Sequence, residues 1–175
     1  MDKGYLYIFT GNGKGKTAAA LGVILRAAGA GRRCLLIQFM KVGFPYSELA
    51  ALLCFEGMID VEQFGDDDHV LEKRVPTIEE RAVARQGLTR CRQALLSGEY
   101  DLIILDEVCP AVHFGLLDEG EVAELFSLRT ERADLLLTGR YCPPAWIEAA
   151  DVVTEMTEIK HYYTRGVTSR KGIDC

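Results

Sequence analysis

The segment Gly11–Thr17, which reads Gly-Asn-Gly-Lys-Gly-Lys-Thr, most constrains what this chain can fold into. It follows the apolar run 5–9 and precedes residues 18–28, which are rich in strong helix formers. A strand, a glycine-rich turn and a helix, in that order, form the setting of a phosphate-binding loop. The glycines let backbone N–H groups point inward, and the helix N-terminus adds unpaired donors with partial positive charge. The sequence therefore predicts a phosphate-binding loop at 11–17, called the phosphate loop below.

Two side chains of the phosphate loop have predicted roles. Lys16 is expected to reach the outer phosphates of a nucleotide, and the hydroxyl of Thr17 is expected to hold a divalent cation. The strict pattern places glycine at position 10, where this chain has Thr10, so the loop is a variant. The alternative interpretation is a glycine- and lysine-rich turn without a ligand, which the flanking strand and helix disfavour.

A second motif is the run Leu102–Glu107, in which four aliphatic residues are followed by Asp106 and Glu107. In a protein with a phosphate loop, a buried strand ending in acids faces the nucleotide and its Mg²⁺. Its carboxyl end emerges at the same edge of a parallel sheet as the phosphate loop. Taken alone, the run also fits a strand that meets a helix cap. Together, the two motifs predict a metal site from Thr17, Asp106 and Glu107, and the pattern does not decide which acid contacts the metal.

The rest of the chain alternates between strand and helix patterns. Strands are expected at Tyr5–Thr10, Cys34–Phe39, Ile59–Phe64, Leu102–Asp106, Leu135–Thr138 and Val152–Met156. Helices are expected at Lys16–Gly29, Ser47–Phe55, Ile78–Ser97, Glu119–Leu128 and Pro144–Ala149. This order predicts an α/β fold of the phosphate-loop NTPase (RecA-like) type, with three layers and a mostly parallel sheet of about six strands. The length predicts one nucleotide-binding domain over 1–175.

One stretch, Gly65–Pro76, is polar and irregular, and we expect it to be a mobile loop. Its run Asp66–Asp68 could bind a cation, but a solvated acidic loop is the favoured interpretation.

Composition narrows the setting of the protein. The net charge of −6 argues against a general nucleic-acid surface, and no apolar run is long enough to predict a membrane span. The first predicted strand begins close to Met1, so no leader is expected. The cysteines form no Cys-x-x-Cys pair and are interpreted as reduced thiols, mostly buried, which favours a cytoplasmic location. They are Cys34, Cys54, Cys91, Cys109, Cys142 and Cys175.

Taken in order, the motifs resemble the ATP:corrinoid adenosyltransferases of the short, phosphate-loop type. The resemblance covers almost the whole chain and includes the family's own variant loop at Thr10–Thr17. Further matching motifs are Leu25-Arg26-Ala27, Gln38–Lys41, Leu105–Glu107, Thr138–Arg140, Ala150–Glu155, Lys160-His161 and Gly172-Ile173.

The resemblance implies transfer of the 5′-deoxyadenosyl group of ATP to the Co(I) of a reduced corrinoid, with release of triphosphate, in adenosylcobalamin biosynthesis or salvage. The triphosphate would be wrapped by Gly11, Asn12, Gly13, Lys14, Gly15, Lys16 and Thr17. Arg26 would contact the nucleotide, and Mg²⁺ (or Mn²⁺) would be approached by Thr17, Glu107 and the nearby Asp106. The resemblance also implies a homodimer and allows a Co(II)-reducing flavoprotein as partner.

The implied chemistry matches the residues present. Co(I) is itself a nucleophile, so no general base is needed, and Lys16 with the metal would stabilise the departing triphosphate. The catalytic set would therefore be Lys16, Thr17 and Glu107. The histidines His69, His113 and His161 are interpreted as surface or structural residues, with His161 the strongest functional candidate.

The chain departs from the family pattern on the corrinoid side. Family members carry a Phe/Trp pair after the third strand, whereas this chain has Phe64 there and its one tryptophan at Trp146. We expect a preference for corrinoids with a weak or absent lower ligand, unless Phe44 or Tyr46 substitutes. The alternatives are an ordinary phosphate-loop ATPase or small-molecule kinase, and a non-catalytic ATP-dependent corrinoid carrier or sensor.

Overall fold

The computed structural model describes residues 4–43 and 46–174. Its strands are β1 (Leu6–Thr10), β2 (Cys34–Phe39), β3 (Ile59–Phe64), β4 (Leu102–Asp106), β5 (Asp134–Thr138) and β6 (Val152–Glu155). Its α-helices are α1 (Lys16–Gly29), α2 (Ser47–Leu52), α3 (Asp68–Leu71), α4 (Ile78–Ser97), α5 (Val108–His113), α6 (Glu119–Ser127) and α7 (Pro144–Ala149). Two 3₁₀ turns, η1 (Leu53–Phe55) and η2 (Tyr162–Arg165), complete the described elements.

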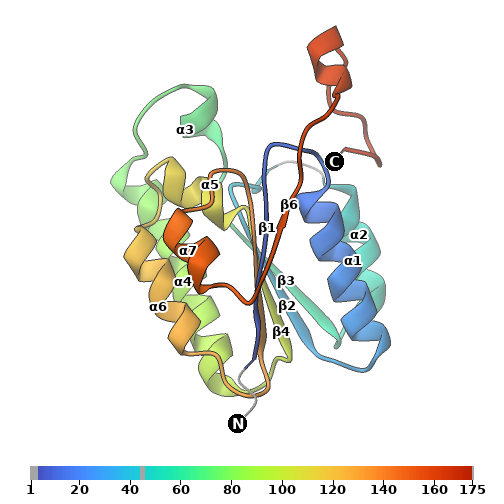
Figure 1. Ribbon diagram of the computed structural model, residues 1–175, viewed down its shortest axis with the longest axis vertical. Coiled ribbons are helices and arrows are strands. Elements are labelled where there is room, and N and C mark those ends of the chain that lie inside the picture. Colours follow the sequence, from blue (N-terminus) through green and yellow to red (C-terminus); the bar gives the residue numbers. More distant parts are fainter. Residues whose placement is uncertain (1–3, 44–45, 175) are drawn as a thin grey trace.

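The strands form one sheet in the order β3-β2-β4-β5-β1-β6, and every neighbouring pair is parallel. The predicted α/β phosphate-loop NTPase-like fold is confirmed, with a sheet that is parallel throughout. Helices α1 and α2 cover one face, and α4, α5, α6 and α7 lie on the other (Figure 1). Because all six strands are parallel, their carboxyl ends and the loops that follow them lie at the same edge of the sheet.

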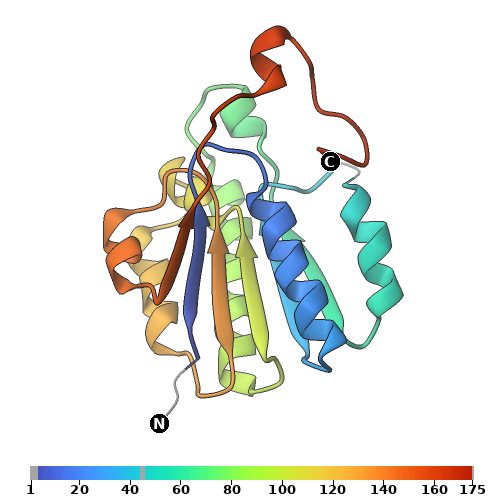
Figure 2. The same ribbon diagram turned by 45° about the vertical axis from the view of Figure 1, so that its right-hand side comes forward.

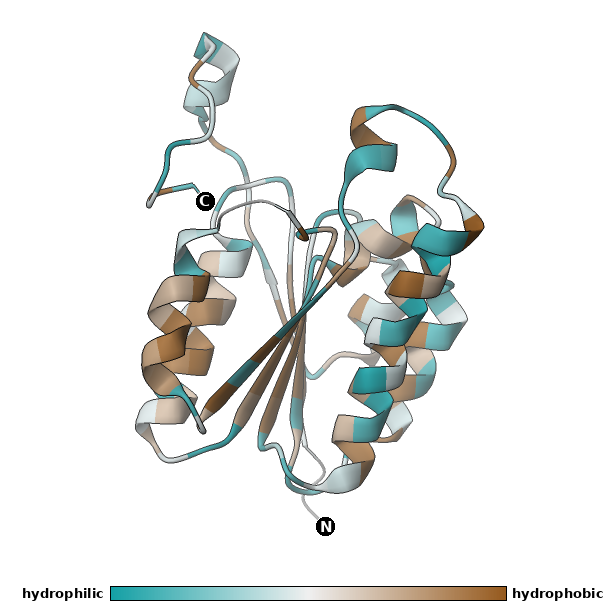
Figure 3. Cartoon of the chain, turned by 180° about the vertical axis from the view of Figure 1, so that it is seen from behind, coloured by the Kyte–Doolittle hydropathy of each residue, from teal (hydrophilic) through white to brown (hydrophobic). Residues whose placement is uncertain are grey.

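Alternate residues of the central strands enter two separate cores. In β2, Leu35 and Ile37 face the cluster around α4 and α6, while Leu36 faces the cluster around α1. Because side chains alternate across a strand, burial on both faces requires an unbroken apolar run. Figure 3 shows these strands in the brown of hydrophobic residues between the two helical layers. This double burial explains why the strand positions were readable from the sequence.

The elements that the sequence analysis missed are short. Helix α3 lies within the stretch predicted as an irregular loop, and α5 follows Glu107 directly. Helix α2 ends at Leu52 and continues as a 3₁₀ turn, where one helix was expected. Helices of four to six residues span too little sequence to show a helical period, so only their packing defines them.

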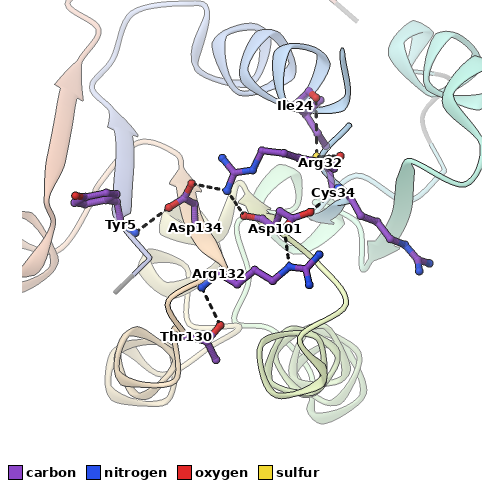
Figure 4. Close-up of polar contacts among 9 residues, drawn as sticks. Tyr5, Ile24, Arg32, Cys34, Asp101, Thr130, Arg132 and Asp134 are labelled. Carbon is purple, nitrogen blue, oxygen red and sulfur yellow. Dashed lines mark hydrogen bonds and ion pairs between the residues drawn. The ribbon is translucent and has the colours of Figure 1, made fainter. Parts of the chain in front are cut away.

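The opposite, amino-terminal edge of the sheet carries a network of charges (Figure 4). Asp101 accepts hydrogen bonds from Nε of Arg132 at 2.7 Å and from the backbone N–H of Arg33 at 2.9 Å. Arg32 bridges the backbone carbonyl of Asp101 and the carboxylate of Asp134, at 2.9 and 3.1 Å. Burial opposes ionisation of Asp101, but these donors lower its pKa. The network ties the loops that enter β2, β4 and β5 to one another.

In the part of the chain that the structure describes, no helix is long and apolar enough to cross a membrane.

Candidate nucleotide site

The phosphate loop joins β1 to α1 at the carboxyl edge of the sheet. Gly11 and Gly15 have φ of 94° and 114°, which is a backbone region that glycine enters without steric cost. The first helical residue, Lys16, turns back over the loop and donates to the carbonyls of Gly11 and Gly13, at 2.8 and 2.7 Å. Its side chain is almost buried, and this burial lowers the pKa of its ammonium. The loop thus encloses a cation at its centre.

The segment that follows β6 packs against the phosphate loop. The N–H of Gly13 donates to the carbonyl of Met156 at 2.6 Å, and the N–H of Met156 donates to the carbonyl of Thr10 at 2.8 Å. A Cβ added to Gly11 or Gly13 would lie 2.5 or 2.7 Å from the Met156 carbonyl oxygen. Glycine at both positions is therefore required by a close backbone approach.

Asp106, at the end of β4, is fully buried and accepts four side-chain hydrogen bonds. Oδ1 receives Thr138 at 2.6 Å and Thr17 at 3.0 Å, while Oδ2 receives Lys41 at 2.7 Å and Gln38 at 3.1 Å. A carboxylate offers about four acceptor positions, and all are occupied here. Burial works against the ammonium of Lys41, but Asp106 raises the pKa of Lys41. Asp106 therefore orients Thr17 and stands behind the pocket.

The neighbouring acid, Glu107, lines the pocket itself. Its backbone is left-handed, with φ of 60°, and its N–H donates to Oγ1 of Thr138 at 2.9 Å. Burial and the charge of Asp106 both raise the pKa of the Glu107 carboxyl. A divalent cation placed beside Glu107 and Thr17 would favour the ionised form.

These groups surround a pocket of about 510 Å³. It is lined by residues 13–18, Leu21, Lys41, Tyr46, Ser47, Glu48, Glu107, Arg140, His161 and 172–174. Lys14, Lys16, Lys41 and Arg140 contribute four cationic side chains to this lining. Such a concentration of positive charge at a helix N-terminus suits a polyphosphate.

A divalent metal fits this donor set. Thr17 and Glu107 supply a hydroxyl and a carboxylate, and Mg²⁺ binds such oxygen ligands together with water and phosphate rather than in an all-protein cage. Among the described residues, no group of three or more His, Cys, Asp or Glu side chains is arranged to hold a metal ion.

Comparison with known proteins decides the family. Residues 2–175 match the family described as ATP:corrinoid adenosyltransferase BtuR/CobO/CobP. The chain belongs to this family. It is 31% identical over 173 residues to the corrinoid adenosyltransferase of Escherichia coli (strain K12), and 32% identical over 173 residues to corrinoid adenosyltransferase CobA of Salmonella typhimurium. Each alignment covers 99% of this chain and 86% of the relative. A corrinoid adenosyltransferase of Pseudomonas aeruginosa is 31% identical over 99% of this chain and 84% of its own length.

Family membership confirms the resemblance found in the motifs: the chain is a member of an enzyme family, the corrinoid adenosyltransferases, whose substrates are ATP and a corrinoid. These enzymes act in adenosylcobalamin biosynthesis or salvage.

Several residues of this adenosyltransferase enter the site without having been assigned a role from the sequence. Lys41 follows β2, Thr138 ends β5 and Arg140 follows it, and all three reach the end of the sheet where β1 and β4 also end. The ammonium of Lys41 also lies 4.9 Å from the ring centre of Tyr46. The rule that ligands bind at the carboxyl ends of parallel strands could have pointed to these positions.

Other predicted residues are placed away from the pocket. Arg26 lies in the last turn of α1 and is exposed, about 15 Å along the helix from Lys16. It does not line the pocket, and neither do Gly11 and Asn12, although the Gly11 carbonyl holds Lys16. The predicted helix already implied this for Arg26, because an α-helix rises about 1.5 Å per residue and carries a residue ten positions on far from its N-terminus.

The aromatic residues considered for the corrinoid side have separate positions. Trp146 is buried against Phe126, with ring centres 5.7 Å apart, and thus belongs to the core. Phe64 packs near Phe39. Tyr46 lines the nucleotide pocket, whereas Phe44 lies outside the described residues.

The three histidines differ in their surroundings. His161 lines the pocket, and its Nδ1 accepts a hydrogen bond from the N–H of Tyr163 at 3.0 Å. His113 is stacked on Tyr141 with ring centres 4.0 Å apart, and Tyr141 has a strained φ of 62°. His69 is buried near Phe114, and neither of its ring nitrogens makes a hydrogen bond with the described residues.

Proposed function

We propose that the pocket around the phosphate loop binds ATP and directs its 5′ carbon to the Co(I) of a reduced corrinoid. The cobalt electron pair forms the new Co–C bond, the C5′–O bond breaks, and its electrons leave with the triphosphate. The observation that carries the proposal is the convergence of Lys16, Thr17 and Glu107 on one cationic pocket in a chain of this family.

Each residue then has a defined task. The ammonium of Lys16 leaves the carbonyls of Gly11 and Gly13 to contact phosphate oxygens, and the N–H groups of residues 14–17, which line the pocket, bind the triphosphate. Thr17 and Glu107 would hold Mg²⁺ or Mn²⁺, and Asp106 positions Thr17 through their hydrogen bond. A bound metal supplies charge neutralisation for the departing triphosphate. The role of Lys14 toward the nucleotide belongs to the same proposal, whereas Asn12 and Arg26 do not line the pocket, which therefore gives no support to the contacts expected of them.

The remaining expectations extend this proposal. We propose one nucleotide-binding domain over 1–175, a homodimer in a cytoplasmic setting, and a reducing partner such as a flavoprotein that generates Co(I). The described cysteines Cys34, Cys54, Cys91, Cys109 and Cys142 are all free thiols, which suits a reducing compartment. Cys175 lies outside the described residues. The net charge of −6 gives no support to a nucleic-acid partner.

An anaerobic assay tests the activity. The protein is mixed with ATP, Mg²⁺ and either cobinamide or cobalamin, chemically reduced to Co(I), and the absorption spectrum and phosphate products are followed. The expected result is an adenosylated corrinoid with one triphosphate per turnover. Formation of ADP would instead identify an ATPase or kinase, and binding without turnover would identify a carrier or sensor.

The metal assignment has its own test. Glu107→Gln replaces a carboxylate by an amide, which is a poor ligand for a hard cation. We expect it to move the Mg²⁺ titration midpoint to a higher concentration while ATP binding without metal changes little. An unchanged metal titration would contradict the assignment of Glu107.

A further inference from the structure

The C-terminal segment 159–174, named the strap here, returns to the phosphate loop. It leaves β6, runs out beyond the sheet and turns back, as Figures 1 and 2 show. Its residues Gly172, Ile173 and Asp174 line the nucleotide pocket. The strap therefore forms a wall of the site from residues far along the chain.

Lys14 of the phosphate loop forms polar contacts with the strap. Nζ of Lys14 donates to the carbonyl of Ile173 at 3.0 Å and pairs with Oδ1 of Asp174 at 3.0 Å. The Asp174 side chain is only 10% exposed, whereas that of Lys14 is 41% exposed. A carboxylate of the strap is thus paired with a cationic side chain of the phosphate loop.

Asp174 is held independently of Lys14. It accepts hydrogen bonds from the hydroxyl of Tyr162, from the backbone N–H of Arg170 at 2.9 Å and from Nε of Arg170 at 3.1 Å. The guanidinium of Arg170 also lies 4.6 Å from the Tyr162 ring centre. The hydrogen bond from Tyr162 is the main cause of a lowered pKa at Asp174. Asp174 therefore keeps three donors and a cationic neighbour when Lys14 moves away.

This arrangement makes Asp174 a competitor of phosphate. A carboxylate and a phosphate oxygen are both anionic acceptors for an ammonium, and charge-assisted hydrogen bonds of this kind are among the strong ones. Exchange of Lys14 from Asp174 to phosphate leaves no unpaired charge behind, because Arg170 remains beside the carboxylate.

We propose that Asp174 is a positioning residue for Lys14, which releases the lysine when the triphosphate chain binds and recaptures it when triphosphate leaves. The exchange lowers the affinity of the site for ATP and for the triphosphate product, and so favours product release. The inference rests on the proposed function in that the pocket must bind a triphosphate.

The test is the dissociation constant for ATP and for inorganic triphosphate, measured by titration calorimetry on the full chain. Asp174→Asn removes the competing charge and should lower both dissociation constants by about threefold to tenfold, which is on the order of 1 kcal/mol. In turnover, KM for ATP should fall. Asp174→Glu, which retains the charge, should stay near the wild type.

Two controls separate this exchange from a general effect of charge. Glu158→Gln removes one exposed negative charge from the vicinity of the strap and should leave both constants unchanged. In a Lys14→Gln background, Asp174→Asn should no longer tighten binding, since double-mutant cycles isolate a pairwise interaction. Thermal melts establish that each variant is folded.

Weaker or unchanged binding by Asp174→Asn would overturn the inference, as would an equal gain from Glu158→Gln or in the Lys14→Gln background. If the wild type binds neither ATP nor triphosphate, the proposed function fails and the inference falls with it. Normal wild-type binding with no effect of Asp174→Asn would remove only the role of Asp174.

Discussion

Asp106 accepts hydrogen bonds from four side chains, two of which, Thr17 and Lys41, line the pocket. Its carboxylate gathers donors from β2, the loop after β2, α1 and β5, and it compensates the buried ammonium of Lys41. Removing one member of a buried charge pair leaves the other charge uncompensated, which costs more than the pair contributes.

Asp106→Asn is therefore expected to destabilise the protein by about 3 kcal/mol, because Lys41 keeps its charge in a buried position. The measurement is chemical denaturation followed by circular dichroism. Glu107→Gln serves as the matched control, since Glu107 is an adjacent acid whose pKa is raised by burial. Equal stability of the two variants would contradict the assignment of Asp106 to a structural role.

Lys16→Ala should weaken ATP binding by roughly tenfold to a hundredfold, the usual range for a lost hydrogen bond to a charged group. The fold should remain, because the carbonyls of Gly11 and Gly13 regain water in an open pocket. Calorimetric titration with ATP and a thermal melt check both statements. Retention of wild-type affinity and turnover would refute the phosphate-loop assignment.

Among the elements, α4 approaches the sheet through a glycine. A Cβ added to Gly87 would lie 2.6 Å from Cε1 of Phe39 and 3.0 Å from Cδ2 of Phe64. The helix begins with a capping box, in which Thr77 and Glu80 satisfy each other's backbone N–H groups. The sequence pattern thus determines where α4 begins, whereas packing against the sheet requires a glycine, without a side chain, in the middle of the helix.

Gly87→Ala is expected to destabilise the protein by about 1–3 kcal/mol through overpacking, although alanine is the better helix former. Gly22→Ala in α1 is the control, because nothing lies within 4 Å of its added Cβ. That variant should gain up to about 1 kcal/mol. Denaturant midpoints compare the two, and a stabilising effect at Gly87 would show that α4 does not pack as described.

Across the whole molecule, the reactivity of the buried thiols measures how well the folded core excludes solvent and reagents. Cys34 and Cys91 are fully buried, whereas Cys54 is exposed. Burial raises the pKa of Cys34 to about 11 and that of Cys91 to about 12, from an ordinary value of 9.0. Both thiols are thus protonated and shielded in the folded state.

Native protein treated with iodoacetamide at pH 8 should be modified at Cys54, while Cys91 reacts only through unfolding. Peptide mass spectrometry measures each rate, and rapid labelling of Cys91 in folded protein would contradict the described core.

The unfolded chain loses the Cys91 proton first, so the free energy of unfolding should fall as pH rises from about 9 toward 12. Cys91→Ala should reduce this slope.

Local pattern was sufficient for much of this protein. All six strands were predicted within about one residue, and for β2, β4 and β5 the reason is that a strand buried on both faces needs an almost unbroken apolar run. The phosphate loop was predicted because glycine spacing, strand and helix all lie within one short segment. Family motifs along the chain then indicated the activity, and the family assignment confirmed it.

Tertiary structure alone decided how the site is arranged. Asp106 and Glu107 are neighbours in sequence, yet one is saturated by donors from other strands and the other lines the pocket. Asp174 was brought to Lys14 from the other end of the chain. Such contacts depend on the order of strands and the path of the strap. The physical reason is that local propensity determines the elements, whereas packing between distant segments determines which side chains meet.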